Sequence, residues 1–423
     1  MEQYGKILLF AMPAFLVLVL LEKWWGKYKG KDTVPTMDMI SSLSSGITNV
    51  TKDVLGIGIT ILGYEWLVNR IALTHIQSTW LLILITFLVL DFAGYWVHRL
   101  DHTINFFWNS HIIHHSSEEF NLACALRQSI STFLKLFAFL LIPAALLGVP
   151  AVIIATVAPI HLFAQFWYHT QHINRMGLLE KILVTPSHHR VHHAINKEYI
   201  DKNYSQIFIF WDKLFDTFQE ELADVKPVYG ITRPAQTWNP VRINFQHLWL
   251  MMQDAWHAKN SKDKLRIWFM PTGWRPTDVA ANYPIPKIED VHHFEKYCTN
   301  SASLFVTWIW VQLTILLLLI SYLFGNIATI GSPDMFIYGI FIFVYVFAYS
   351  ELMDGNKYAM VWELIKASFG LAVIFYYGDW FGASKFIPWI GNFLLVYFIT
   401  SSFVTAWFTY SSGKEEKSFT VPV

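Results

Sequence analysis

Residues 80–115 read WLLILITFLVLDFAGYWVHRLDHTINFFWNSHIIHH. The first half of this stretch is almost wholly apolar, and a helix that crosses a bilayer needs about 20 such residues. The second half contains His98-Arg-Leu-Asp-His102 and His111-Ile-Ile-His114-His115. Spacings of three and four place side chains on one face of a helix, and neutral imidazole is the commonest side-chain metal ligand. The stretch therefore predicts a membrane helix that leads into a metal centre.

A third histidine cluster follows another apolar region and reads His189-Arg-Val-His192-His193. The three clusters together hold eight histidines, which exceeds the four ligands that one zinc ion normally takes. Two metal ions fit this number better than one. Imidazole binds iron, copper and zinc alike, so the histidines by themselves leave the identity of the metal open.

Further polar residues lie close to these clusters. Asp91 precedes His98 and His102 on the same helix face, and ligating histidines commonly donate their second N–H to a carboxylate. Asp91 is therefore a candidate to orient one imidazole, although it could also simply mark the end of the span. His169 and His172 follow the next apolar region, and we expect His169 to complete the site and His172 to be an interfacial polar residue.

The apolar runs predict an all-α integral membrane protein with about nine transmembrane helices. A hairpin at residues 132–167, interrupted by Pro143, Gly148 and Pro150, contributes two of the crossings. Lysines follow the first and last runs, and lysine marks the cytoplasmic side of a membrane protein. We therefore expect the histidine clusters to face the cytoplasm. The runs are residues 7–21, 54–73, 80–97, 132–167, 304–324, 335–349, 359–377 and 386–407.

Four segments are expected along the chain. Residues 1–79 form amino-terminal membrane helices, and residues 80–247 form the catalytic core with its two metals. Residues 248–303 form part of a polar cytoplasmic cap, and residues 304–423 form the carboxyl-terminal membrane helices.

Composition agrees with a membrane protein. Hydrophobic residues make up 54% of the 423 residues and charged residues only 15%, against about 25% charged in soluble domains. The formal net charge of zero argues against nucleic-acid binding, which needs a basic surface. The two cysteines, Cys124 and Cys298, provide neither a disulfide framework nor a cysteine-type zinc site.

No dinucleotide fingerprint or P-loop occurs in the chain. Electrons for redox chemistry would then come from an external donor, either a protein partner or a small diffusible reductant.

The order H-x-x-x-H, H-x-x-H-H, apolar hairpin, H-x-x-H-H resembles the fatty acid hydroxylase and sterol desaturase superfamily. Within it, the chain most resembles the alkylglycerol monooxygenases over roughly residues 91–247. The stretches that carry this closer resemblance are HHSSEEFNL at 114–122, ALRQS at 125–129, TPSHHRVHH at 185–193, DKNY at 201–204 and WDK at 211–213.

This resemblance implies an integral membrane oxygenase with a di-iron centre. It also implies hydroxylation of the carbon beside the ether oxygen of an alkylglycerol, using O2 and a tetrahydropterin. Two departures are Gln171, where the family often has Glu, and Asp216, where the family has Gly. Neither removes a ligand. The ligands carried over by motif position are His98, His102, His111, His114, His115, His169, His189, His192 and His193.

Other functions remain open from the residues alone. A sterol, fatty-acid, sphingolipid or carotenoid hydroxylase or desaturase would use the same centre. A metal transporter would be expected to place ionisable residues along several spans near the midplane. A zinc hydrolase would need an open water position and a general base, and no clear base accompanies the clusters.

Overall fold

The computed structural model describes residues 2–56, 64–74, 76–132, 140–299 and 302–411. Its regular structure is helical, and the described part contains no β-strand beyond two isolated bridges, Leu183 with Phe208 and Ala194 with Tyr229. The expectation of an all-α protein is therefore confirmed.

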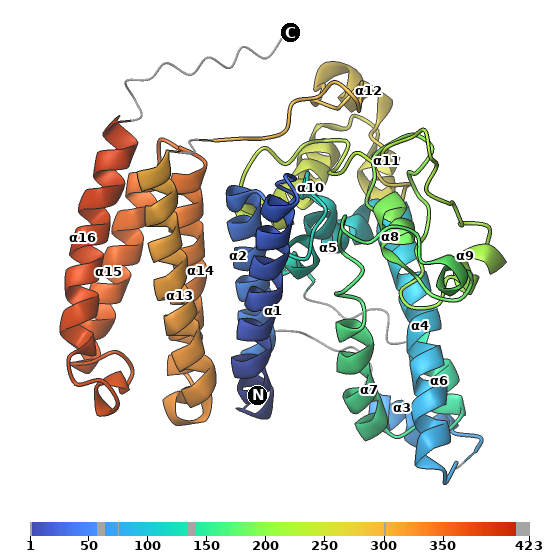
Figure 1. Cartoon of the computed structure of the whole chain (residues 1–423), viewed down its shortest axis with the longest axis horizontal. Coiled ribbons are helices and arrows are strands. Elements are labelled where there is room, and N and C mark those ends of the chain that lie inside the picture. The colour runs from blue at the N-terminus through green and yellow to red at the C-terminus, as the bar shows by residue number, and fades with distance from the viewer. Residues whose placement is uncertain (1, 57–63, 75, 133–139, 300–301, 412–423) are drawn as a thin grey trace.

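Six helices of the described part are long and apolar enough to cross a membrane. They are α1 (Glu2–Tyr28), α4 (Thr79–Thr103), α13 (Ser303–Ile330), α14 (Asp334–Met353), α15 (Ala359–Tyr377) and α16 (Ile390–Ser411). The long helices stand side by side, and the cap gathers at one end of them (Figure 1). The chain is thus a membrane protein, with six spans that correspond to six of the predicted runs.

The remaining predicted crossings coincide with short helices. The predicted run at 54–73 contains α3 (Tyr64–Ile71), and the predicted hairpin contains α6 (Ile142–Leu146) and α7 (Ala151–Phe163). Parts of both predictions, residues 57–63 and 133–139, lie outside the described residues. Gly148 separates α6 from α7 at a φ of +69°, and a Cβ there would lie 2.1 Å from the Thr74 carbonyl oxygen. Only glycine tolerates both this positive φ and so close a carbonyl. Gly148 therefore explains why α6 and α7 do not form one continuous helix.

Helix α2 (Thr36–Val54) was not predicted, because its many serines and threonines give it little hydropathy. It is nevertheless largely buried and packs against α1, α13 and α14. Several of its hydroxyls donate to carbonyls of the same helix: Ser44 donates to the Ile40 carbonyl at 2.6 Å, and Thr51 donates to the Ile47 carbonyl at 2.7 Å. Because these hydroxyls find backbone acceptors, a polar helix can be buried here without a large cost.

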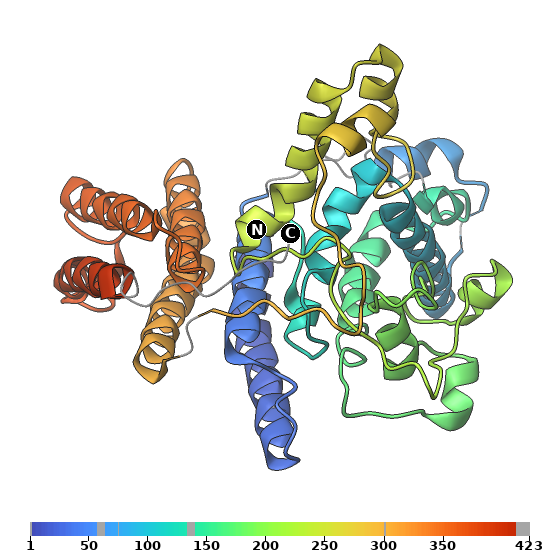
Figure 2. The same cartoon turned by 90° about the horizontal axis from the view of Figure 1, so that it is seen from above.

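The carboxyl-terminal helices α13 to α16 form a bundle on one side of α1 and α2. The histidine-bearing segments lie on the other side, as the view from above shows (Figure 2). A polar cluster lies inside this bundle, where Lys366 pairs with Glu363 at 2.9 Å and also donates to Gln312 and Ser401. All four side chains are fully buried.

The cap consists of α10 (Pro240–His257), α11 (Ser261–Arg266), α12 (Thr277–Asn282) and the loops around them. It lies at the end of α4 that carries His98 and His102 (Figure 1). Arg275 forms a buried two-point ion pair with Asp254 of α10, at 2.6 and 2.8 Å, which joins the loop before α12 to α10. The cap therefore covers the end of α4 where the predicted ligands His98 and His102 lie.

Candidate metal centre

The first two histidine clusters are brought together by a sharp turn between two helices. His98 and His102 lie on the last turns of α4, and His111, His114 and His115 lie on α5 (Asn105–His115). Between the helices Ile104 adopts an extended conformation, with φ −124° and ψ 126°. This single extended residue ends α4 and lets α5 pack against it.

The third cluster comes from α8 (Pro186–His192) and the residue that ends it, His193. Pro186 occupies the first turn of the helix, where its missing N–H costs no hydrogen bond. His169 reaches the same place from the loop after α7, and its backbone N–H donates to the Phe166 carbonyl at 3.3 Å.

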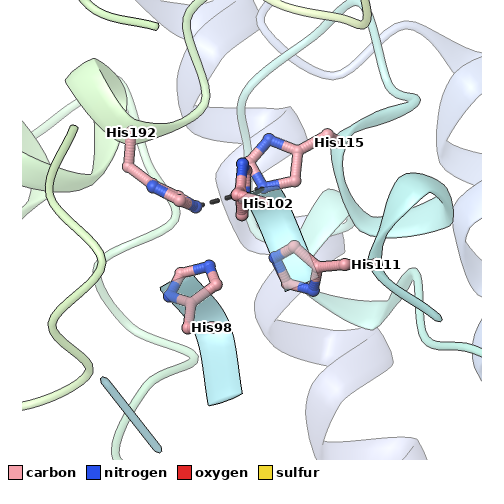
Figure 3. A group of neighbouring side chains, drawn as sticks. All are labelled: His98, His102, His111, His115 and His192. Atoms are coloured by element: carbon pink, nitrogen blue, oxygen red, sulfur yellow. Dashed lines mark hydrogen bonds between the residues drawn. The ribbon is translucent and has the colours of Figure 1, made fainter. Parts of the chain in front are cut away.

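All nine predicted ligands converge, and they divide into two groups. One, the five-histidine group, is His98, His102, His111, His115 and His192, and the other, the four-histidine group, is His114, His169, His189 and His193. Within each group the candidate ligand atoms lie within 4.8 Å of one another. Figure 3 shows the rings of the five-histidine group turned toward a common centre.

The division explains the H-x-x-H-H motif. His111 and His115 are four residues apart and share a group, whereas the neighbours His114 and His115 belong to different groups. His192 and His193 divide in the same way. Residues four apart share a helix face and adjacent residues do not, so one short helix can supply ligands to two metals at once.

In the four-histidine group the Nε2 atoms form a closed ring. His193 Nε2 lies 3.1 Å from that of His114 and 3.0 Å from that of His189. His169 Nε2 lies 2.8 Å from that of His189 and 3.4 Å from that of His114. Imidazole nitrogens bound to one metal at about 2.0–2.1 Å are separated by about 3.0–3.4 Å, so these spacings fit a shared ion.

The five-histidine group has the same pattern. His115 Nε2 lies 3.1 Å from the Nε2 atoms of both His102 and His192. The Nε2 atoms of His98 and His111 are buried and have no hydrogen-bond partner within the described residues. A buried polar atom without a partner costs free energy, and a metal ion at the centre of the group would satisfy both atoms.

Backbone carbonyls fix the tautomer of four of these rings. Nδ1 of His98 donates to the Tyr204 carbonyl at 2.7 Å, and Nδ1 of His192 donates to that of Lys202 at 2.9 Å. His114 and His169 donate in the same way to Arg127 and Gln165, at 3.3 and 3.0 Å. A neutral ring that carries its proton on Nδ1 presents a bare lone pair at Nε2. Lone pairs that face one another repel, so these sites fit a cation.

The environment favours the neutral, metal-binding form of the histidines. Burial lowers the pKa of His169 to about 3. Burial, followed by neighbouring imidazoles, also lowers the pKa of His114, His115, His189 and His193 well below the usual value. Imidazoles with such pKa values are unprotonated at neutral pH, as metal ligation requires.

The prediction that Asp91 orients a ligating histidine is wrong. Its carboxylate instead accepts from the backbone N–H groups of Ile207 and Phe208 at 2.9 and 3.1 Å, and from Trp211 Nε1 at 2.9 Å. It also contacts His161 Nε2 at 2.9 Å. Asp91 lies nearly two helical turns before His98, too far to reach its ring, and it anchors the loop that follows Tyr204.

A buried ion pair between Arg127 and Asp38, which the sequence did not predict, contacts the residues that hold His114 and His115. Arg127 Nη2 lies 2.6 Å from Asp38 Oδ1 of α2, and its other nitrogens donate to Ser42 and Ser116 at 2.9 and 2.7 Å. Ser116 directly follows His115, and the Arg127 carbonyl accepts from His114. Arg127 stood within a family-like stretch, ALRQS, but its partner lies on the unpredicted helix α2.

The remaining polar residues near the site lie outside both groups. His172 Nε2 lies 2.9 Å from Thr33 Oγ1, as expected for a residue that is not a ligand. Gln171 donates to the Phe120 carbonyl at 3.0 Å. Asp216 has a φ of +57°, the left-handed conformation that glycine adopts most easily, so the change from Gly in the family pattern falls at a true turn.

A cavity of about 430 Å³ opens beside both histidine groups. Its wall includes His98 and His111 of the five-histidine group and His169 and His189 of the four-histidine group. Most of the remaining wall is apolar, as in many small-molecule sites. The apolar residues come chiefly from α1 and α7 and include Leu8, Ala11, Phe15, Pro159, Leu162 and Phe163. An alkyl chain in this cavity would lie within the membrane helices, with one end beside the histidines.

Comparisons with known proteins agree with this site. The family model "Fatty acid hydroxylase" matches residues 83–217, which include all nine histidines. No solved structure matches the chain.

The chain is similar to alkylglycerol monooxygenases over much of its length. The human protein is 32% identical over 363 residues, which cover 84% of this chain and 80% of that protein. The proteins of Xenopus tropicalis and Danio rerio are 37% and 36% identical over 277 and 279 residues, covering 64% and 65% of this chain and 60% and 61% of their own lengths. The ornithine lipid hydroxylase OlsE of Rhizobium tropici is 30% identical over 145 residues, covering 34% of this chain and 44% of its own length. The chain therefore belongs to the alkylglycerol monooxygenase family within the fatty acid hydroxylases, and it is a membrane lipid monooxygenase.

Proposed function

We propose that this monooxygenase hydroxylates the carbon beside the ether oxygen of an alkylglycerol. One oxygen atom of O2 enters the C–H bond, and the other leaves as water with two electrons and two protons from an external donor. The resulting hemiacetal breaks into an aldehyde and a glycerol derivative. The observation that carries this proposal is the apolar cavity whose wall includes histidines of both groups, because a lipid C–H bond there lies beside the metal site.

The metals proposed are two iron ions, one in each histidine group. The ligands are the nine residues of these groups: His98, His102, His111, His115 and His192 for one ion, and His114, His169, His189 and His193 for the other. Five nitrogens exceed the four ligands that zinc usually takes, whereas imidazole is a common ligand of iron. When bound, the iron pair would supply the activation of O2. The protein's own residues hold the ligand tautomers, position the lipid and limit the access of water.

The substrate's alkyl chain would lie against α1 and α7. Phe15 of α1 contacts the rings of Phe163 and Phe166, with ring centroids 5.1 and 4.5 Å apart. These aromatic contacts join the two helices along the cavity wall. Burying the chain there removes apolar surface from water and keeps water away from the reacting carbon.

The electron donor is proposed to be a tetrahydropterin or another small external reductant. The chain has no dinucleotide fingerprint, which supports an external source. The rate of oxidation of added tetrahydropterin tests this part of the proposal. It should be lower in a metal-free sample than in the wild type with its metal.

The histidine groups and the cap are proposed to face the cytoplasm, and α3, α6 and α7 to belong to segments that enter the membrane between the long spans. Four lysines, Lys23, Lys27, Lys29 and Lys31, lie at the cap end of α1, which supports this orientation. The proposed segments remain residues 1–79, 80–247, 248–303 and 304–423. With the exposed Cys298 replaced by Ser, a cysteine introduced at Asn260 of the cap should be labelled by a membrane-impermeant reagent only after cells are opened. Labelling in intact cells would indicate the opposite orientation.

Turnover of defined lipids tests the substrate. Purified full-length protein with iron, reductant and 18O2 should convert an alkylglycerol to a fatty aldehyde that carries the label. Sterol, fatty-acid, sphingolipid and carotenoid substrates serve as the alternatives, and an unsaturated product without label would indicate desaturation. Turnover of one of these lipids with none of the alkylglycerol would overturn the proposed substrate.

A further inference from the structure

Two glutamine side chains interrupt the apolar wall of the cavity beside the metal site. Gln165 lies shortly after α7, and Gln206 lies in the loop after Tyr204; both line the cavity. Gln165 Nε2 donates to Gln206 Oε1 at 3.3 Å. Amides in an apolar cavity are costly to desolvate unless they find partners. We therefore asked which groups the two amides bond to and which of their atoms are left for a ligand.

Gln206 is held in its position by a glycine of α4. A Cβ on Gly94 would lie only 2.0 Å from Gln206 Oε1 and 2.4 Å from its Cδ. The amide therefore rests directly on the backbone of α4. Within the part of the chain that the structure describes, no protein acceptor lies within hydrogen-bond distance of Gln206 Nε2, which leaves this donor available to a ligand in the cavity.

Gln165 is held by a network that leads away from the cavity. Its Nε2 contacts His161 Nδ1 at 3.3 Å, and Tyr168 OH donates to its Oε1 at 3.4 Å. His161 in turn contacts Asp91, which also accepts from the backbone N–H of Ile207, the residue after Gln206. Asp91 thus links the supports of both glutamines, so that their separation is fixed by the fold.

The pair lies next to both histidine groups. Gly94, on which Gln206 rests, is four residues before His98 of the five-histidine group. Gln165 is four residues before His169 of the four-histidine group, and its carbonyl accepts from His169 Nδ1. Gln165, Gln206 and histidines of both groups thus line the same cavity, together with the apolar residues of α1.

We propose that Gln165 and Gln206 recognise a hydrogen-bonding oxygen of the lipid beside the carbon that is oxidised. The proposal rests on the proposed function and adds to it the residues that select the substrate. Gln206 Nε2 donates to the ether oxygen, and the alkyl chain extends toward α1. The C–H bond presented to the metals is then the one next to this oxygen, and a chain without the oxygen leaves the half-buried amide unpaired.

Four other amide or carboxylate side chains line the cavity, and each has a partner within the protein. Asp101 accepts from Ser110 Oγ at 3.0 Å, and Gln128 Nε2 donates to the Ala125 carbonyl at 3.2 Å. Asn49 and Asp53 of α2 lie 3.4 Å apart and bond to each other, and Lys52 lies 3.5 Å from Asp53. Gln206 Nε2 differs from these groups because it has no acceptor among the described residues.

The test compares an alkylglycerol with its carba-analogue, in which a CH2 group replaces the ether oxygen. Two variants address the pair. Gln206→Leu removes the amide, whereas Gly94→Ala keeps the glutamine in the sequence but pushes its amide away from α4. Gln253→Leu, at an exposed position of α10, is the matched control. For each protein, kcat/KM is measured for both lipids, and the dissociation constant of each lipid is measured without O2, when no turnover occurs.

Wild type should prefer the ether lipid by at least about tenfold, because the analogue leaves the half-buried amide of Gln206 without an acceptor. Gln206→Leu and Gly94→Ala should reduce this preference by about tenfold in both binding and kcat/KM, with iron content retained. Equal losses on both lipids, or an unchanged preference, would overturn the inference while leaving the proposed function intact. Failure of the wild type to oxidise the ether lipid at all would instead overturn the proposed function, and the inference with it.

Discussion

His114 and His115 are adjacent in the sequence, yet their imidazoles belong to different histidine groups. His114 Nε2 lies 3.1 Å from that of His193, whereas His115 Nε2 lies 3.1 Å from that of His192. His192 and His193 are also adjacent. Two pairs of neighbouring histidines on α5 and α8 therefore face each other and hold the two groups side by side.

Replacing either member of a pair should affect one metal and spare the other. For His114→Ala we expect faster loss of one equivalent of metal to a chelator, and for His115→Ala faster loss of the other, each by more than about tenfold. A difference in the spectrum of the remaining iron identifies which ion stays. His172→Ala is the control, since this histidine lies outside both groups. Parallel loss of both ions in each variant would show that the groups are not separate sites.

Removing the Arg127 side chain should destabilise the protein strongly. Arg127→Met leaves Asp38 buried without its partner, which typically costs about 3–5 kcal/mol. Loss of the Ser116 contact should also weaken metal binding by His114 and His115. The free energy of unfolding in detergent measures the first effect, and metal content measures the second.

The matched control for that experiment is Arg175→Met. Arg175 forms an exposed ion pair with Glu220 at 3.7 Å, and its side chain is 57% exposed. Exposed pairs contribute about 0–1 kcal/mol, so this variant should be nearly as stable as the wild type. Similar losses in the two arginine variants would contradict a supporting role for the Arg127–Asp38 pair.

Asp91→Ala should loosen the loop that carries Tyr204. The carboxylate accepts from two backbone N–H groups and from Trp211, and the Tyr204 carbonyl holds His98 in its tautomer. Removal of such indirect partners typically lowers metal affinity or activity by about 10–100-fold. Hydrogen exchange should increase at residues 204–211, and an unchanged exchange rate there would exclude the loop as the cause.

The polar cluster of the carboxyl-terminal bundle predicts a strong coupling between two charges. Lys366→Met leaves Glu363 buried without its lysine partner, and it should cost more stability than the double replacement with Glu363→Gln. A double-mutant cycle on unfolding in detergent should give a coupling of about 0.5–3 kcal/mol. Iron content should not change, because this bundle lies on the far side of α1 and α2 from the histidines (Figure 2). Additive effects would mean that the two charges do not interact.

Much of the metal site could be predicted because its signals are local. Histidines at i and i+4 on a helix share a face, and motif order added His169, so the sequence named the nine histidines that the structure brings together in two groups. The long spans were predictable for the same reason, since hydropathy accumulates over 20 neighbouring residues.

The supporting residues could not be predicted, because they depend on contacts between distant segments. Helix periodicity predicted that Asp91 orients one of the ligating imidazoles, but its partners are His161 and backbone N–H groups more than 100 positions away. The burial of α2 depends on hydroxyls that bond to their own helix, which a hydropathy average does not record. Gln165 and Gln206 become neighbours only when the loop after Tyr204 folds against α4.

The most direct test of the two-metal account is the iron content of active, purified full-length protein, determined together with its Mössbauer spectrum. We predict two irons per chain in two distinguishable nitrogen-rich environments, one for each histidine group. Full activity with one iron per chain, or with zinc alone, would contradict the account.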